Sequence, residues 1–383
     1  MNQLSSTPCR FEARAWLEDR LLAVSSKAVQ VDRPGGAPML CFPISDVRTE
    51  LATLPDGILL APVLDGFVAF DTKHPRVEVM LVDRLPGEPD RDHTLVRFPT
   101  WGDAADLIDI LNVRPHAEGG YQSAVRYSPL RDVVEGSQLL AQAIVAAGRH
   151  APGRRVVSAS MVFMRAANTS APLRIDLNEL SNGKSFTTLA PQVRQSGKLC
   201  ASGIMLLDVT APDVMRHSVS FPETSGPYAS EFFDMSMTGR DIRFVDGAYT
   251  GDPDAPIGPP LLDAWVRFRH VPDDRHLHAA LLAHFTGNAS IAAAMRPHAG
   301  IGQNQAHHTL STAINAISIS FHADVRADKW MLYRHHSTFA GDGMTHSECR
   351  VYDCDRALLA SFTVDAMVRR MPTARPVDAR TSL

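Results

Sequence analysis

The polar side chains best placed to do chemistry lie between Arg275 and His322. This segment opens on a long apolar stretch, Leu277 to Met295, with Asn288 set into its apolar side. A turn rich in glycine and histidine follows, and a strand-like alternation of apolar residues then ends at His322. A buried helix that meets a sheet at polar residues is typical of an active-site core. We therefore expect the functional site where this helix and this strand meet.

Asn288 is the first candidate, and two interpretations of it stay open. It shares a helical stripe with Leu281, Phe285 and Ile291, which points its amide toward the sheet. A buried amide left without a hydrogen bond costs about 1–3 kcal/mol, so the side chain needs a partner. Alternatively, Gly287 and Asn288 together kink the helix and the local backbone satisfies the amide.

The histidines that follow raise the question of a metal centre. His307 and His308 are adjacent, and His298 and His322 are nearby in the sequence. Neighbouring side chains on a strand point to opposite faces, and no aspartate or glutamate accompanies these histidines. We therefore expect no metal site here. His307 could instead line a substrate channel, or it could be an ordinary surface or structural histidine.

The composition is that of an ordinary globular protein. The chain has 383 residues, 45% of them hydrophobic and 21% charged, which is enough for two or three domains with packed cores. A net charge of −4 offers no basic surface for nucleic acid. Five cysteines without metal-ligand spacing predict reduced thiols. With neither a signal-peptide pattern nor an apolar run of about 18 residues, we expect a cytoplasmic protein without membrane insertion.

Residues 1–90 predict a small β-rich domain. Short runs of strand-forming residues are separated by turn signals such as the Pro-Gly-Gly of residues 34–36. The expected strands are 11–17, 21–25, 28–31, 39–43, 67–70 and 77–82. Residues 85–97 are polar and contain prolines, which is typical of a linker.

Residues 98–208 and 261–371 predict two copies of one plan, a helix followed by an antiparallel sheet. The expected helices are 103–111, 134–148 and 277–295. The expected strands are 155–165, 172–180, 185–195 and 199–207 in the first copy, and 261–268, 313–322, 330–338, 345–352 and 357–368 in the second. Residues 209–260 predict an irregular connection with one helical turn at 229–233, and residues 372–383 a disordered tail.

The duplicated plan is that of a double hotdog, a fold of the α+β class. Its two helix-wrapped antiparallel sheets would pair edge to edge with both helices on one side. The small β-rich domain would precede this pair. Gly136 begins the main helix of the first copy, and its backbone amides could polarise a carbonyl or hold a phosphate. Close packing of helix against sheet is the alternative reason for this glycine.

Several short segments support this plan by a resemblance to a known family. They are Gly136-Ser-Gln-Leu-Leu-Ala-Gln-Ala, Ser181-Asn-Gly-Lys-Ser-Phe, Val193-Arg-Gln-Ser-Gly-Lys, Ala294-Met-Arg-Pro-His, Ile319-Ser-Phe-His, Trp330-Met-Leu-Tyr and Leu359-Ala-Ser-Phe-Thr-Val-Asp-Ala-Met-Val-Arg. In this order they resemble the type II acyl-CoA thioesterase family, a double hotdog, over residues 98–371. Separately, Cys41-Phe-Pro-Ile-Ser-Asp-Val-Arg and Asp65-Gly-Phe-Val-Ala-Phe-Asp resemble a family of small all-β domains of unknown function.

The thioesterase resemblance implies an acid in the second helix, a threonine on the next strand and a glutamine on the last strand, which together orient a water. This chain departs from that pattern. The acidic position falls on Gly287, and the glutamine position falls on Val364 or Asp365. The threonine position falls near Ser311 and Thr312.

The resemblance therefore implies a rearranged catalytic set. Asp365 would be the base, while Asn288 and Thr312 would orient the water or the carbonyl. Asp365 could instead be a solvated carboxylate at a strand edge. The residues expected to contact the substrate are Gly136, Gly287, Ser311 and His307.

The function implied is hydrolysis of an acyl thioester to coenzyme A and free acid, within lipid metabolism, with no metal or redox cofactor. The partner would be acyl-CoA or a carrier-bound acyl thioester, and the chain would form a homo-oligomer. A first alternative is hydration, dehydration or acyl transfer on a bound acyl chain. A second is a non-catalytic acyl-thioester-binding or scaffold protein whose active site has decayed.

Overall fold

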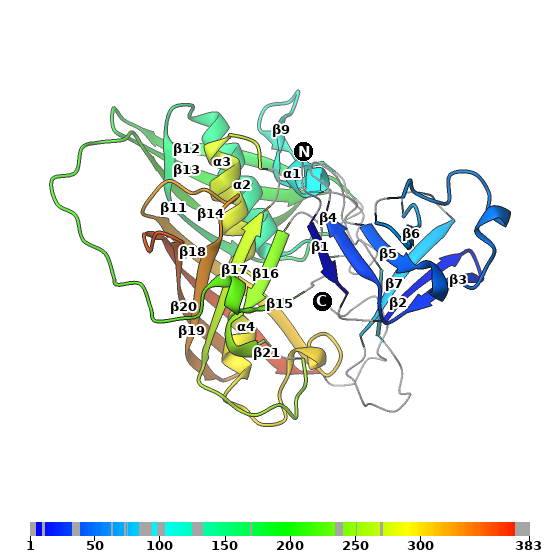
Figure 1. Ribbon diagram of the computed structural model, residues 1–383. Coiled ribbons are helices and arrows are strands. Elements are labelled where there is room, and N and C mark those ends of the chain that lie inside the picture. The colour runs from blue at the N-terminus through cyan, green and yellow to red at the C-terminus, as the bar shows by residue number, and fades with distance from the viewer. Residues whose placement is uncertain are drawn as a thin grey trace.

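The N-terminal residues form two small antiparallel sheets around a core of their own in the computed structural model (Figure 1). The structure describes residues 5–9, 12–32, 39–62, 64–72, 74, 76–83, 94–97, 104–124, 133–168, 171–233, 240–249, 251–268 and 271–371. One sheet has the order β1-β4-β5-β6 and the other β3-β2-β7-β8. Their strands are β1 (Ser5–Pro8), β2 (Glu12–Leu17), β3 (Arg20–Ser25), β4 (Val29–Asp32), β5 (Met39–Pro43), β6 (Phe67–Ala69), β7 (Val77–Asp83) and β8 (Thr94–Arg97).

Alternation along the strands explains this first core. Ala13, Ala15 and Leu17 occupy every second position of β2 and are buried, because successive side chains of a strand point to opposite faces. They pack with Leu22 and Phe42. The predicted linker, 85–97, differs from the structure at its end, where residues 94–97 form β8 against β7. The rest of that linker lies outside the described residues, as does the predicted tail, 372–383.

Within the described residues, 13 strands from residue 114 onward form one large sheet. Its order is β15-β16-β17-β19-β20-β21-β18-β11-β14-β13-β12-β10-β9. We call β9 to β14 the first half-sheet and β15 to β21 the second half-sheet. The first contains β9 (Arg114–Pro115), β10 (Tyr121–Gln122), β11 (Arg155–Phe163), β12 (Arg174–Asn182), β13 (Phe186–Gln195) and β14 (Lys198–Asp208). The second contains β15 (Glu231–Phe233), β16 (Arg240–Phe244), β17 (Leu261–Phe268), β18 (Leu310–Phe321), β19 (Met331–Gly341), β20 (Met344–Asp353) and β21 (Leu358–Arg370).

The two half-sheets join edge to edge where β11 pairs with β18, with Met161 opposite Ile317. Both side chains are fully buried beneath the helices. The helices α2 (Gly136–His150), α3 (Arg275–Phe285) and α4 (Ser290–Met295) pack on the sheet, with α2 and α3 side by side (Figure 1). Helix α1 (Ala104–Leu111) packs against α2 and α3. The edge-to-edge pairing and the shared helix side are those that the sequence predicts.

Small residues let α2 approach its neighbours. Four alanines of this helix, Ala141, Ala143, Ala146 and Ala147, are fully buried. A side chain on Gly148 would overlap the ring of His276, because α2 and α3 cross at this point. The helix is therefore the centre of the large core. No helix in the described ranges has both the length and the apolar character needed to cross a bilayer.

The second helix is broken, whereas the sequence predicts one helix over 277–295. α3 ends at Phe285 and α4 begins at Ser290. Ala289 adopts a left-handed backbone conformation with φ of 66°, which no α-helix can continue. The apolar pattern runs across the break because both pieces face the same core. The apolar pattern alone therefore conceals the interruption, whereas the alternative interpretation, in which Gly287 and Asn288 kink the helix, places it correctly.

Strands β15 and β16 also differ from the prediction, which treated residues 209–260 as irregular with a helical turn at 229–233. The turn of 3-10 helix ends at Ala229, and Glu231–Phe233 is a strand instead. It pairs with Arg240–Phe244, which pairs in turn with β17. A partly buried ion pair supports this edge, with the Asp241 carboxylate 2.6 Å from the Arg267 guanidinium. The many glycines and prolines around these short strands obscured them.

Candidate active site

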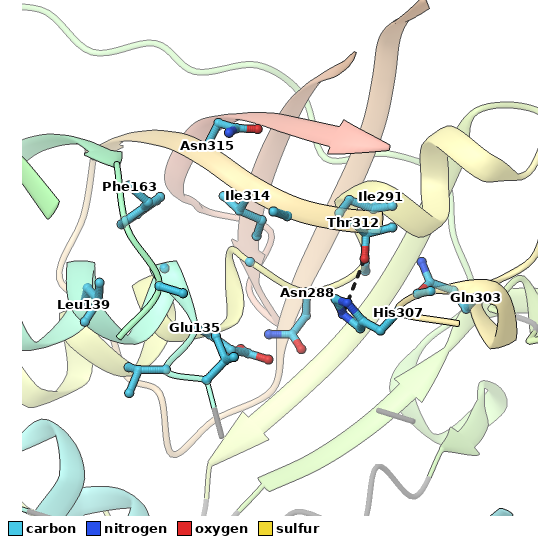
Figure 2. Close-up of a pocket in the computed structure, with 18 of the residues that line it drawn as sticks. Glu135, Leu139, Phe163, Asn288, Ile291, Gln303, His307, Thr312, Ile314 and Asn315 are labelled. Carbon is cyan, nitrogen blue, oxygen red and sulfur yellow. Dashed lines mark hydrogen bonds between the residues drawn. The ribbon is translucent and has the colours of Figure 1, made fainter. Parts of the chain in front are cut away.

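A cavity of about 410 Å³ lies where the start of α2 meets the break between α3 and α4. The turn before β18 and the first residues of β18 close its other side (Figure 2). Both half-sheets therefore contribute to one pocket, with the first giving β11 residues and the second giving β18 residues. Its described lining includes Glu135, Gly136, Leu139, Phe163, Phe244, Tyr249, Phe285, Gly287, Asn288, Ile291, Gln303, His307, His308, Thr312 and Ile314.

Asn288 sits in the break of the second helix, so its side chain is set by the loop rather than by a helical stripe. Its backbone amide bonds to Phe285 O at 3.0 Å, and its carbonyl accepts from Ser290 N at 2.9 Å. The side-chain Nδ2 is buried and has no hydrogen-bond partner among the described residues. A buried amide donor in this state is costly, typically about 1–3 kcal/mol. It is therefore suited to donate to a group that enters the cavity.

His307 and Thr312 form a second polar pair. Thr312 Oγ1 lies 3.4 Å from His307 Nε2, across the turn that leads into β18 (Figure 2). His307 has a left-handed backbone with φ of 66°. Non-glycine residues in this region tend to mark functional sites, since the strain must be held by surrounding structure. Among the described residues, no group of three His, Cys, Asp or Glu side chains is placed to hold a metal ion.

Gly136 and Gly287 both line the cavity, and at each position neighbouring side chains leave no room for a Cβ. A Cβ on Gly136 would lie 2.8 Å from the Phe163 ring. A Cβ on Gly287 would lie 2.6 Å from Ser137 Oγ and 3.0 Å from Ile314 Cδ1. The break after α3 thus packs against the first turn of α2, and the start of α2 packs against Phe163 of β11, so close packing explains both glycines.

Buried polar contacts hold the far side of the break. Ser290 Oγ lies 3.0 Å from His335 Nδ1, and Cys349 Sγ lies 3.4 Å from the same nitrogen. Burial lowers the pKa of His335 to about 3 and raises the pKa of Cys349 to about 12. Both are therefore neutral near pH 7. Through Ser290 they fix the start of α4, two residues after Asn288.

The sequence reasoning missed Glu135, which is the only carboxylate among the described residues that line the cavity. It is the N-cap of α2, yet its side chain makes no capping hydrogen bond. Glutamate is a poor N-cap compared with Ser, Thr, Asp or Asn. That unusual residue, just before the helix that Gly136 begins, was a signal in the sequence.

Buried Arg240 of β16 places a positive charge next to Phe285, which lines the cavity. Its guanidinium lies 5.3 Å from the centroid of the Phe285 ring. Burial lowers the pKa of Arg240 to about 10, against the raising effect of Glu135, so it remains a cation near neutral pH. Burial, and then the charge of Glu135, raise the pKa of Tyr249 to about 12. Tyr249 stacks on Phe244 with ring centroids 4.5 Å apart.

The structure does not bring Asp365 to this cavity. Buried Val364 and Ala366 face the helices, and Asp365 between them faces the opposite side of the sheet. There its Oδ1 lies 2.7 Å from His346 Nδ1, and its side chain is half exposed. Ser311 precedes Thr312 on β18, so its side chain also points away, and it is not among the lining residues. Asn288, Thr312, Gly136, Gly287 and His307 do converge on one cavity.

Comparisons with known proteins agree with this architecture. A family model described as "Acyl-CoA thioesterase N-terminal domain" matches residues 124–207, and one described as "Acyl-CoA thioesterase C-terminal domain" matches residues 215–368. Together the two ranges span more than half of the chain. The chain belongs to the acyl-CoA thioesterase family. The resemblance inferred from the sequence motifs is thereby confirmed.

Relatives and solved structures extend this assignment. Acyl-coenzyme A thioesterase 8 of Rattus norvegicus is 25% identical over 299 residues, which cover 70% of this chain and 89% of the relative. The tesB protein of Mycobacterium avium subs paratuberculosis superposes with a TM-score of 0.60 at 19% identity, covering 70% of this chain and all of that one. Acyl-CoA thioesterase II TesB2 of Mycobacterium marinum gives 0.59 at 22%, covering 69% and 98%. The predicted double hotdog is confirmed.

Proposed function

We propose that this chain hydrolyses acyl-CoA thioesters in the cavity between α2 and the break after α3. Family membership supports the reaction class, and one observation supports the place. The Nδ2 of Asn288 is a buried donor that has no partner among the described residues and sits in the wall of that cavity. Attack on a thioester carbonyl puts negative charge on its oxygen, and an amide donor in a water-poor site stabilises that charge.

Thr312 is the second member of the proposed set. Its hydroxyl lies within reach of His307 and on the same cavity as Asn288. A hydroxyl can accept from a water while donating to a ring nitrogen, so this pair can hold the attacking water in one orientation. Thiolate is a good leaving group, and little more than a positioned water and oxyanion donors is required. The products are coenzyme A and the free acid.

Gly136, Gly287 and His307 are proposed to contact the substrate, whereas Ser311 is not, because its side chain points away from the cavity. The first amides of α2 have no partner within the helix, and they form an end that favours negative charge. Gly136 packs closely against the Phe163 ring, and both residues line the cavity beside these amides. The apolar residues Leu139, Phe163 and Ile291 line the rest of the cavity and suit an acyl chain.

Release of thiol from a panel of acyl-CoAs, from short to long chains, tests the proposal directly. In water enriched in ¹⁸O, we expect free coenzyme A and a free acid that carries the label, because the oxygen comes from the attacking water. If no member of the panel releases thiol, hydrolysis is wrong. If enoyl- or 3-hydroxyacyl-CoA instead gains or loses water as judged by mass, the pocket performs hydration chemistry.

We also propose a setting for this activity. The chain acts in the cytoplasm, on acyl-CoA in lipid metabolism, without a cofactor and as a homo-oligomer. None of its five cysteines, all within the described ranges, is bonded in a disulfide, which is consistent with a reducing compartment. The residues of β1 to β8, whose core is separate from the large one, are proposed to form a distinct domain.

A further inference from the structure

The side chain of Glu135 is oriented into the cavity rather than onto its own helix. It lines the pocket, and it makes no hydrogen bond to the amides that an N-cap side chain would normally serve. Figure 2 shows its carboxylate and the amide of Asn288 pointing toward one another across the cavity. A carboxylate and an amide donor, from two different helices, thus face the same space.

Crowding explains why the carboxylate comes from α2. At the end of α3, Gly287 has no room for a side chain, since its Cβ would be 2.6 Å from Ser137 Oγ. Ser137 is the second residue of α2, and Glu135 lies two positions before it. The contact between Ser137 and Gly287 therefore leaves no room for an acidic side chain at position 287. The same contact places the start of α2, and with it Glu135, at the cavity.

The groups facing Glu135 come from several elements. Arg240 of β16 is a buried cation that interacts electrostatically with Glu135, and Tyr249 is a buried neutral phenol. His307 and His308 belong to the turn before β18. Arg165, which follows β11, is an exposed cation on the rim. The fixed charge buried at this wall is that of Arg240, whose pKa of about 10 keeps it a cation near neutral pH.

We propose that Glu135 is the general base of the hydrolysis, an inference that rests on the proposed function. Its carboxylate takes a proton from the water as the water oxygen bonds to the thioester carbon. Asn288 donates to the carbonyl oxygen as that oxygen becomes negative. The carbon–sulfur bond then breaks, and the Glu135 carboxyl returns the proton to the departing thiolate. Water and thioester are thereby converted to acid and thiol, with the carboxylate restored.

A purely structural role for Glu135, as the counter-ion of Arg240, predicts different behaviour. Loss of a counter-ion would lower the melting temperature, and added small acids would not repair it. Loss of a general base would lower kcat while leaving KM and the melting temperature little changed. It would also remove the fall in kcat/KM that protonation of this carboxylate causes at acid pH.

The experiment compares the full-length chain with its Glu135→Gln and Glu135→Ala variants on the best acyl-CoA of the panel. We expect Glu135→Gln to lower kcat by about 10²–10⁴-fold, with KM within a few-fold and the acid limb of the pH profile lost. Formate should restore part of the activity of Glu135→Ala, since it can occupy the vacated space and accept the proton. Glu179→Gln, which removes an exposed carboxylate beside His150, is the matched control and should leave kcat unchanged.

A Glu135→Gln variant that keeps kcat within threefold of an active wild type overturns the inference and leaves the proposed function intact. So does a loss of activity that follows the melting temperature and that formate does not rescue. A wild-type chain that hydrolyses no acyl-CoA overturns both. Loss of kcat with a normal melting temperature, together with formate rescue, supports Glu135 as the base.

Discussion

Helix α2 and the pair α3–α4 hold equivalent places on the two half-sheets, but they differ at the cavity. α2 is continuous from Gly136 to His150. Its counterpart stops at Phe285 and resumes at Ser290, with Asn288 in the gap. The continuous helix presents its N-terminal end, and the broken one presents a loop. Each half-sheet therefore supplies a different kind of polar group to one pocket.

The difference shows how duplicated elements can divide one task. A helix end is a fixed feature, because its amides and its first residues are positioned by the whole helix. A loop inside a helical segment can turn an amide inward, but only if the surrounding structure holds it there. Here Ser137 presses on Gly287 from one side, and His335 holds Ser290 from the other. The following predictions test how much each support matters.

The largest effect on stability is expected at the contact between the two helices. Gly287→Ala places a methyl group 2.6 Å from Ser137 Oγ, so α2 or the break must shift. Overpacking of this kind costs about 1–3 kcal/mol, which we expect as a lower melting temperature and reduced thiol release. Gly226→Ala is the control, because no atom lies within 4 Å of that added group. Equal melting temperatures for the two variants would show that α2 and the break can move apart to accept the methyl group without loss of stability.

A somewhat smaller effect is expected where α4 begins. Ser290→Ala removes the contact with buried His335, and the loss of one hydrogen bond typically costs about 1 kcal/mol. Denaturant unfolding should reveal this loss, and thiol release should fall because Asn288 is less firmly held. Ser318→Ala, which breaks an exposed contact with Ser160, should change stability by less than about 0.5 kcal/mol. A Ser290→Ala variant as stable as the control would remove this support from the account.

The buried histidines predict how stability depends on pH. Burial lowers the pKa of His284 and of His335 to about 3, against 6.5 for an exposed histidine. Between these values the unfolded chain binds more protons than the folded one, so stability must fall as the pH falls from about 6.5 toward about 3. We expect His335→Asn to show a weaker fall in melting temperature over this window than the wild type. Parallel curves would contradict the assignment.

The smallest effect is expected from relaxing the left-handed residue of the break. Ala289→Gly removes the Cβ that disfavours φ of 66°, a gain of roughly 1 kcal/mol, partly offset by the greater freedom of glycine in the unfolded chain. We expect a melting temperature equal to or slightly above that of the wild type. Ala292→Gly, inside α4, should lower it instead. Destabilisation by Ala289→Gly would show that this alanine methyl is needed for packing.

The sequence predicts the large sheet well because its strands repeat apolar residues over long runs. Leu261 to Phe268 is expected as a strand and is β17. The sequence does not predict strands β15 and β16, because they are short and are flanked by residues typical of turns. The apolar period does not show the break after α3, because Phe285 and Ile291 both pack toward the core. Only the kink interpretation of Gly287 and Asn288 places an interruption there.

The sequence predicts only some residues of the candidate site, because it does not show which face of each strand meets the cavity. Alternation already groups Asp365 with Thr363, on the face opposite Val364. Deciding which face meets the cavity requires the pairing of β18 with β21 and the position of the helices, which no single strand reveals. Glu135 joins the cavity through the packing of α2 against the break, a contact between residues about 150 positions apart. Spacing along the chain cannot show it.

The most direct test of the central claim compares the two sides of the sheet. Rates of thiol release are measured for Asn288→Ala, on the cavity side, and Asp365→Ala, on the opposite side. We predict that Asn288→Ala lowers kcat by about 10²–10³-fold, as loss of an oxyanion donor does, while Asp365→Ala stays within about twofold of wild type. A severe loss in Asp365→Ala with an unimpaired Asn288→Ala would contradict the account and move the chemistry to the other face.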